Sequence, residues 1–348
     1  MLFSPSAFLL FLFAAQLPPG SGSRISGRVA DTASGAPISG ARVELMMVVD
    51  GPDGTFGRRP RQSVTDANGS FAFDGLESGQ YQLKVEKAGF AAYPDVFGDA
   101  QIERLTIDAN SKDPQLRIAL NKGAVVAGRI VNSSGEPEAD LHVSALRRTD
   151  KAGPIGFAQV GNATTNDLGE FRMANLHSGE YRIVAAAQRH GPFDAIGTGS
   201  SATLAPTFFP GTPDQNAARS VTLAPGQTVT GVEFTMIAVS AFRVSGVVVD
   251  QAGRPSPQAM VTLIPDLRSR GLFMPIMVLA ADDGTFEIGQ VIPGTYHLDA
   301  SAREGGVGAT GGGGFFAAFS DDAPLSGPGT ITVGSADLTG LRVVASRR

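Results

Sequence analysis

The stretch GLESGQYQLKV, residues 75–85, decides the fold because the chain repeats it twice. Residues 176–184 read LHSGEYRIV and residues 291–299 read VIPGTYHLD. Each copy places a tyrosine two residues after a turn glycine and continues with alternating apolar residues, which is typical of a strand buried on one face. The turn glycines are Gly79, Gly179 and Gly294, so the copies lie 100 and 115 residues apart and predict three tandem units.

Two further segments recur in the same order within each unit. Residues 26–45, 127–146 and 245–264 each read as a strand, a polar turn with Gly or Pro, and a second strand. A Gly-x-Phe pair follows at Gly69 and Phe71, at Gly169 and Phe171, and at Gly284 and Phe286. Because these segments are short, β-branched and aromatic, and alternate at period two, the sequence predicts an all-β fold with two packed antiparallel sheets in each unit.

The repeated tyrosine is expected to be structural. It resembles the corner tyrosine of immunoglobulin-like sandwiches, whose ring is buried while its hydroxyl bonds to nearby backbone. The preceding glycine permits a turn with positive φ. Since a buried ring cannot also stack on a sugar, we interpret these pairs as folding devices: Gly79 with Tyr81, Gly179 with Tyr181, and Gly294 with Tyr296.

The order of these motifs gives each unit a recognisable outline. A Gly-(Arg/Val)-(Val/Ile) strand, Asp-x-x-Gly-x-Phe and Leu-x-x-Gly-x-Tyr together resemble the carboxypeptidase regulatory-like domain, although the third unit has Val291 in place of the leucine. The resemblance implies seven-stranded prealbumin-like sandwiches, close to Cna-B and carbohydrate-binding-like folds, at residues 24–122, 123–240 and 241–348. It also implies an accessory domain of exported proteins that performs no hydrolysis itself.

The amino terminus predicts export. Residues 1–20 contain an apolar run over 7–15 and a Pro-Pro-Gly break, the layout of a secretory signal peptide, and the run is too short to span a bilayer. No later segment is apolar for eighteen residues, so no membrane span is expected after cleavage. With a net charge of −5 and no basic run, a nucleic-acid partner is excluded, and the lack of cysteine excludes disulfides and thiolate sites.

Metal and cofactor sites are not expected. The sequence HSGE at 177–180 matches the His-x-x-Glu of zinc carboxypeptidases, with His297 as a distant third ligand, but the same two slots hold unrelated residues in the other units. The loop DANGSFAFDGLE at 66–77 has the oxygen spacing of a calcium loop, yet Phe71 stands where the EF-hand needs glycine. The glycine run 305–314 lacks the Lys-Ser/Thr of a phosphate loop.

Aromatic residues in two insertions are the candidate binding residues. Phe208 and Phe209 lie in the insertion 188–214, and Phe315 and Phe316 lie in the insertion 303–319. Paired aromatics in a Pro/Gly-rich loop could form an exposed platform for polysaccharide, but the favoured interpretation of 208–214 is that one phenylalanine packs beneath its loop.

The sequence therefore predicts a secreted, periplasmic or surface protein without enzymatic activity. Its expected role is structural, adhesive or accessory at the bacterial cell envelope, with a polysaccharide or another envelope protein as partner. Two alternatives stay open: a carbohydrate-binding protein with a starch-binding-like fold, and an accessory part of a secreted metallocarboxypeptidase system.

Overall fold

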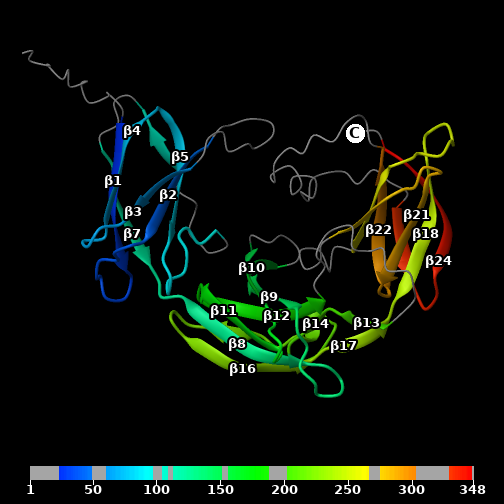
Figure 1. Ribbon diagram of the computed structural model, residues 1–348. Coiled ribbons are helices and arrows are strands. Elements are labelled where there is room, and N and C mark those ends of the chain that lie inside the picture. Colours follow the sequence, from blue (N-terminus) through cyan, green and yellow to red (C-terminus); the bar gives the residue numbers. More distant parts are fainter. Residues whose placement is uncertain are drawn as a thin grey trace, which may run out of the picture. The chain divides into compact units, whose positions relative to one another are not determined.

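The computed structural model describes residues 23–48, 60–96, 104–108, 113–150, 156–187, 202–265, 275–302 and 329–346. Within these ranges the regular elements are strands, apart from the short 3-10 helix η2 (Gln215–Ala217). The strands form pairs of sheets (Figure 1), as the predicted all-β sandwich fold requires. The predicted signal peptide lies outside the described residues. Among those described, none forms a helix with the length and apolar character that a bilayer crossing needs.

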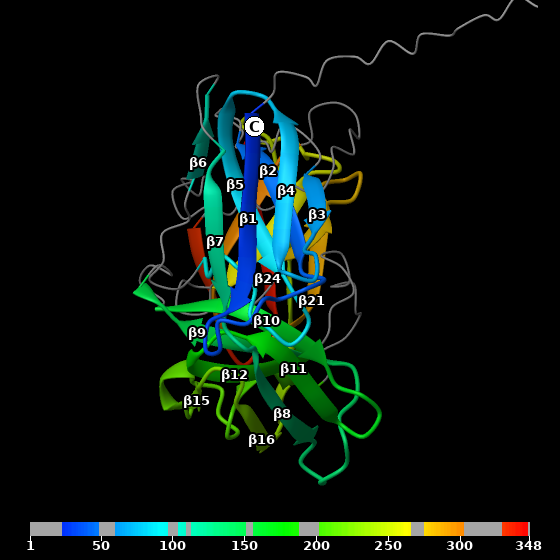
Figure 2. The ribbon, with the colours of Figure 1, turned by 90° about the vertical axis from the view of Figure 1, so that its left-hand side faces the viewer.

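The first sheet pair contains one three-stranded and one four-stranded sheet. The three-stranded sheet has the order β4-β1-β7, and Figure 2 looks onto it. Its strands are β1 (Ser23–Asp31), β4 (Ser70–Leu76) and β7 (Gln115–Leu120). The other sheet has the order β3-β2-β5-β6 and consists of β2 (Arg42–Val48), β3 (Arg61–Val64), β5 (Gly79–Glu86) and β6 (Arg104–Ile107).

The second sheet pair repeats this plan and adds short strands. One sheet has the order β11-β8-β16 and the other the order β10-β9-β12-β14, with β15 also paired to β12. The strands are β8 (Ala124–Val131), β9 (Leu141–Arg148), β10 (Phe157–Thr164), β11 (Glu170–Leu176), β12 (Gly179–Ala187), β14 (Thr207–Phe208), β15 (Val221–Leu223) and β16 (Thr228–Thr235). A separate ribbon pairs β13 (Ala202–Ala205) with β17 (Ile237–Ser240).

The third sheet pair has the plan of the first. Its sheets have the orders β21-β18-β24 and β20-β19-β22-β23. The strands are β18 (Phe242–Val249), β19 (Met260–Pro265), β20 (Ile276–Leu279), β21 (Thr285–Val291), β22 (Gly294–Ser301), β23 (Gly329–Val333) and β24 (Leu338–Val344). The domain limits expected from the sequence, near residues 123 and 241, fall between sheet pairs but stay a prediction.

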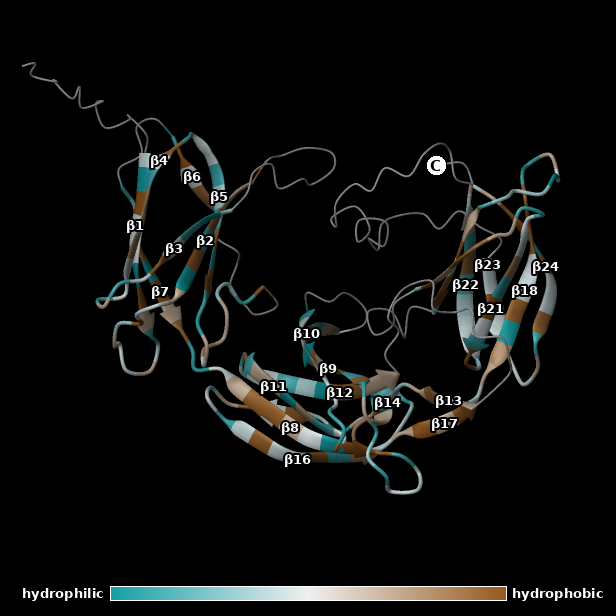
Figure 3. Cartoon of the chain, in the orientation of Figure 1, coloured by the Kyte–Doolittle hydropathy of each residue, from teal (hydrophilic) through white to brown (hydrophobic). Residues whose placement is uncertain are grey.

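Alternation along the strands produces the cores. Figure 3 shows hydrophobic and hydrophilic residues alternating along β16, as expected for a strand with one buried face. The buried residues of the second and third sheet pairs form separate clusters, one within 124–236 and one within 244–345. Each pair of sheets therefore hides its own apolar surface.

One glycine in the first strand of each sheet pair is required by close packing. Its neighbour is the last strand, which runs parallel to it in the second and third sheet pairs and shifts register at this point. A Cβ atom would overlap or crowd the carbonyl oxygen of the facing residue: Leu116 opposite Gly27, Val232 opposite Gly128, and Leu341 opposite Gly246. The repeated Gly in the opening motif thus allows the two strands to approach.

The described chain forms two compact units. These compact units are not the three repeats of the sequence. The first compact unit holds the residues up to 30, 35–85 and 103–119, and the second compact unit holds the rest. Residues 86–96 directly follow β5 of the first sheet pair in sequence, yet they belong to the second unit.

Candidate functional site

The repeated tyrosine occupies the same corner in every sheet pair. Its ring is buried, with exposed fractions of 5%, 0% and 5% for Tyr81, Tyr181 and Tyr296. Its hydroxyl donates to the backbone carbonyl four residues earlier, over 2.9 Å to Glu77, 2.7 Å to His177 and 2.8 Å to Ile292. Burial raises the pKa of Tyr181 to about 12, so this hydroxyl stays protonated and can donate. The rings have no free face for a ligand.

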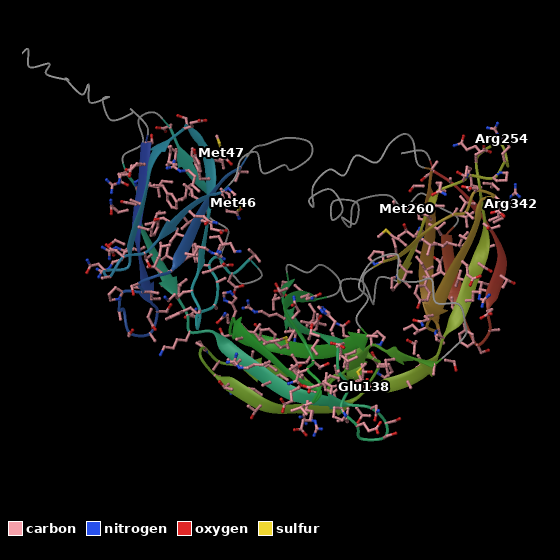
Figure 4. All side chains as sticks on the ribbon, viewed as in Figure 1. Met46, Met47, Glu138, Arg254, Met260 and Arg342 are labelled. Atoms are coloured by element: carbon pink, nitrogen blue, oxygen red, sulfur yellow. The ribbon has the colours of Figure 1, made fainter. Side chains whose placement is uncertain are left out.

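The glycine before the tyrosine has the expected positive φ in the second sheet pair, at Gly179 (φ 150°), but not in the other two. Gly79 and Gly294 do not adopt positive φ, and a left-handed residue lies four positions earlier, at Gly75 (φ 65°), Asn175 (φ 60°) and Gln290 (φ 54°). A Cβ atom on Gly79 would lie 2.6 Å from Cε of Met47, which Figure 4 labels, but this is the far end of a flexible side chain that can move aside. The prediction of positive φ was therefore wrong for Gly79 and Gly294.

The Gly-x-Phe pairs are structural as well. Gly69, Gly169 and Gly284 have φ of 73°, 72° and 81°, and a Cβ atom there would crowd a carbonyl oxygen of the first strand. The phenylalanines of these pairs are buried: Phe71, Phe171 and Phe286. These residues shape the turn and fill the core.

A cluster of polar and charged side chains surrounds the turn before β12, and we call it the clasp: Asp95, Arg147, His177 and Asn175. Nη1 of Arg147, on β9, lies 2.7 and 2.6 Å from the two carboxylate oxygens of Asp95. Nδ1 of His177 lies 3.3 Å from Oδ2 of the same carboxylate. The side chains of Arg147, Asp95 and His177 are only 12%, 21% and 22% exposed, so water screens these charges weakly.

The clasp holds residues 86–96 together with backbone hydrogen bonds. The N–H of Gly89 donates to Oδ1 of Asn175 over 3.0 Å. The N–H of Gly123 donates to the carbonyl of Gly89, and the N–H of Ala91 donates to the carbonyl of Asn121, each over 2.9 Å. Residues 86–96 are therefore fixed to the second sheet pair.

The charge state of His177 depends on its burial. Burial lowers the pKa of His177, and the nearby Arg147 cation lowers it further, while the Asp95 carboxylate and a backbone hydrogen bond with Ala92 oppose this. Because burial is the largest cause, His177 is neutral at neutral pH and can donate a hydrogen bond to Asp95 from Nδ1.

The residues of the zinc motif have other partners. His177 contacts Asp95, whereas Oε1 of Glu180 accepts a hydrogen bond from Oγ of Ser220 over 2.6 Å and Oε2 lies 3.3 Å from Nη1 of Arg148. His297 lies on β22, in the third sheet pair. Within the described ranges no group of three or more His, Cys, Asp or Glu side chains could hold a metal ion.

The calcium-like loop forms a turn between β3 and β4. Oδ1 of Asp66 accepts hydrogen bonds from the N–H groups of Asn68 and Ser70, each over 2.8 Å. The N–H of Gly69 donates to the Asp66 carbonyl over 3.0 Å. The carboxylate thus closes its own turn.

Phe208 and Phe209 are buried, so they cannot form an exposed platform and that prediction was wrong. Their exposed fractions are 3% and 4%. Phe208 packs with Leu146 and Val184 in a small apolar cluster separate from the main core of the second sheet pair. Phe209 belongs to that main core, where its ring meets Phe234 edge-on at 6.1 Å. Phe315 and Phe316 lie outside the described residues.

Sequence reasoning missed the clasp. His177 was considered only as a zinc ligand, and Asp95 and Arg147 were not considered. The one signal available was that His177 stands at a turn position where the third sheet pair has the apolar Ile292.

Known proteins match the chain at the level of the domain. Residues 24–120 and 125–237 match the family model described as "Carboxypeptidase regulatory-like domain". No curated protein matches the chain.

Several solved structures of bacterial proteins resemble the chain at low identity. The Streptococcal ancillary pilin is 14% identical with a TM-score of 0.30, over 94% of this chain and 99% of that chain. GBS52, the minor pilin of Streptococcus agalactiae, is 15% identical with a TM-score of 0.30, over 62% and 97%. The Bacillus anthracis TIE protein is 10% identical with a TM-score of 0.24. The match covers 92% of this chain and 50% of that protein. These TM-scores are too low to support an argument about activity.

Proposed function

The chain belongs to the carboxypeptidase regulatory-like domain family, and on this premise we propose that it is an exported, non-catalytic array of three β-sandwich domains. The domains would occupy residues 24–122, 123–240 and 241–348, one for each sheet pair. The proposed role is structural or adhesive, at a bacterial cell envelope.

The observation that carries the proposal is the recurrence of one corner. The hydroxyl of the buried tyrosine donates to the carbonyl four residues earlier in all three sheet pairs. The repeated residues thus shape backbone and core, and the residues suspected of chemistry, His177 and Glu180, are engaged in ion pairs and hydrogen bonds. A chain whose repeated residues are structural suits a scaffold whose loops provide the contacts.

Export is supported by the amino-terminal pattern alone. The test is to produce the full chain with a carboxy-terminal tag in a bacterial host and to fractionate the cells. We expect a product shortened by about 20 residues outside the cytoplasm. A Leu9→Arg, Leu10→Arg variant, in which charges interrupt the apolar run, should stay full-length in the cytoplasm. Wild-type protein that stays full-length inside the cell would contradict export.

The domain proposal is tested by limited proteolysis of the purified protein. Cleavage near residues 122 and 240 should leave stable fragments of about 100 residues, a common domain size. A single resistant core that spans both positions would contradict three domains.

The absence of catalysis is tested by metal analysis and a carboxypeptidase assay on the same protein. We expect neither stoichiometric zinc nor hydrolysis, and finding both would refute the proposal. The alternative of an aromatic carbohydrate platform loses its support at Phe208 and Phe209, which are buried.

A further inference from the structure

The outer face of the sheet β4-β1-β7 forms a groove of about 1160 Å³. Figure 2 shows these three strands side by side. All residues that line the groove belong to the first compact unit. Three arginines line it, Arg24, Arg28 and Arg117, beside small residues of the same strands: Ser26, Ala30, Ser70, Ala72 and Ala119.

Two of the arginines lie next to each other. Gly27 lies against Leu116, since a Cβ atom on the glycine would come within 2.9 Å of Cβ of Leu116. The N–H of Ser26 donates to the carbonyl of Pro114 over 3.4 Å and the N–H of Thr32 to the carbonyl of Leu120 over 2.9 Å, so β7 runs parallel to β1. The following residues on these strands, Arg28 and Arg117, are therefore neighbours. Nε of Arg28 donates to the carbonyl of Asn68 over 2.7 Å. The side chain of Arg117 makes no hydrogen bond or ion pair with any residue in the described part of the chain.

The corresponding positions of the other sheet pairs do not carry two cations. In the second sheet pair the register places Glu233 beside Arg129, which joins opposite charges. In the third it places Arg342, labelled in Figure 4, beside Val247. Like charges on adjacent strands destabilise a sheet. The pair of Arg28 and Arg117 therefore lowers the stability of the first sheet pair, and the other two sheet pairs have no such pair of like charges at this position.

The carboxylates that line the groove are already engaged. Asp66 accepts the hydrogen bonds of its own turn. Asp113 accepts hydrogen bonds from Oγ of Ser26 and Nε2 of Gln115, each over 3.1 Å, and lies 3.7 Å from Nε of Arg24. Asp113 thus forms its ion pair with Arg24. The guanidinium groups of Arg28 and Arg117 have no acidic partner among the described residues.

We propose that this groove binds a linear anionic polysaccharide. Carboxylate or sulfate groups of the polymer would pair with Arg28 and Arg117, because a guanidinium group binds such oxygens through two parallel hydrogen bonds. The hydroxyl of Ser70 would meet the sugar hydroxyls, whereas Ser26 and Gln115 are held by Asp113.

Of the larger apolar residues that line the groove, Phe71 and Ile118 are buried and Leu116 is half-buried, so Val64 is the exposed one. The accessible lining is therefore mainly small and polar, which favours a sugar chain over a folded protein. The aromatic residue that lines the groove, Phe71, is only 5% exposed, so the groove offers no ring face on which nucleic-acid bases could stack.

This inference deepens the proposed adhesive role and rests on it for its biological setting, but it is tested separately on purified full-length protein. Polygalacturonate is the probe, and dextran of similar length is the neutral control, both by isothermal titration calorimetry. We expect binding of polygalacturonate that weakens at least tenfold between 50 and 300 mM salt, because salt screens exposed charges (about a 10 Å range at 0.1 M), and no binding of dextran.

Two matched substitutions locate the site. Arg117→Glu gives the first sheet pair the opposite-charge arrangement of Arg129 and Glu233, so it should fold and lose at least tenfold in affinity. Arg342→Glu makes the same change in charge at the corresponding position of the third sheet pair and should leave affinity unchanged. Circular dichroism checks folding, and Arg117→Gln replaces the first variant if that one is unstable.

Equal affinity of the two variants, or no binding of polygalacturonate, would overturn the proposal. Equally tight binding of poly-glutamate or single-stranded DNA would overturn the assignment to a polysaccharide. None of these results bears on export or on the domain limits, so failure of this inference can be distinguished from failure of the proposed function.

Discussion

The second and third sheet pairs have the same corner in different surroundings. Tyr181 donates to the carbonyl of His177, whose side chain contacts Asp95, whereas Tyr296 donates to the carbonyl of Ile292, whose side chain is apolar. Across the strand, Arg147 faces Tyr181 and Pro265 faces Tyr296. The corner bond uses backbone oxygen and does not depend on the turn side chain. The second sheet pair can therefore use those side chains to hold another segment of the chain.

The largest effect is expected where the two sheet pairs are alike. Gly128→Ala and Gly246→Ala would each push a Cβ atom into a carbonyl oxygen of the last strand. Each should lower the free energy of unfolding by about 3 kcal/mol, at the upper end of overpacking costs. Thermal and urea unfolding followed by circular dichroism measures the loss. Gly334→Ala is the control, since nothing lies within 4 Å of the added atom, and an equal loss in that variant would contradict the steric explanation.

The next effect should be confined to the second sheet pair. Asp95→Asn removes the negative charge that meets Arg147 and His177, both largely buried. We expect the free energy of local opening of residues 86–96 to fall by about 2 kcal/mol, since an uncompensated buried charge is costly. Hydrogen exchange measured by mass spectrometry reports on Gly89 and Ala91. Peptides from residues 275–302 should be unchanged, and unchanged exchange in 86–96 would show that the clasp does not hold the segment.

Acid should distinguish the two corners. Because burial lowers the pKa of His177, the unfolded segment takes up a proton more readily than the folded one. The contribution of His177 to stability is therefore complete above the unfolded pKa of about 6.5 and is lost as the pH falls through the lower folded value. The protection factor of residues 86–96, taken relative to the intrinsic exchange rate at each pH, should fall by a few fold below about pH 6.5. His177→Ile, which copies the third sheet pair, should remove this fall, and its persistence would assign it to another group.

The corner bond itself should contribute equally in both places. Tyr181→Phe and Tyr296→Phe each remove a hydroxyl that bonds to a carbonyl over 2.7 or 2.8 Å. Each should cost about 1 kcal/mol, the usual net value of a hydrogen bond. Urea unfolding of the two variants and of Tyr81→Phe provides the comparison. A cost that appears only for Tyr181 would mean that the clasp, rather than the corner, depends on this hydroxyl.

The smallest effects should have opposite signs. Gln290 has φ of 54°, a left-handed conformation that is unfavourable for glutamine and that glycine adopts freely. Gln290→Gly should therefore raise the free energy of unfolding by about 0.5 to 1 kcal/mol. Asn175 has φ of 60° but also accepts the hydrogen bond from Gly89. Asn175→Gly should therefore accelerate exchange of residues 86–96. Calorimetry of the first variant and hydrogen exchange of the second test the contrast, and a gain in both measures would rule out a role for the amide.

The features that the sequence could predict are local. Period-two alternation identified the strands, and the spacing of Gly69 and Phe71 or Gly79 and Tyr81 identified turns and corners, because these depend on residues close together in the chain. The position of positive φ was missed since only Gly75 among the three equivalent residues is a glycine.

The features that the sequence could not predict are contacts between distant residues. Asp95 and Arg147 are 52 residues apart, and no local pattern indicates that they meet. Phe208 and Phe209 were expected to share one surface, but adjacent residues of an extended chain point to opposite sides. Each side has an apolar cluster that takes one ring.

The parallel pairing of β8 with β16, and of β18 with β24, has a mechanical consequence. In each case the first and last long strands of a sheet pair run in the same direction, so the chain enters at one end of the sheet and leaves at the other. Tension applied to the two ends would shear one strand along its neighbour and load all the hydrogen bonds between them together. A string of such domains resists stretching until an entire ladder ruptures.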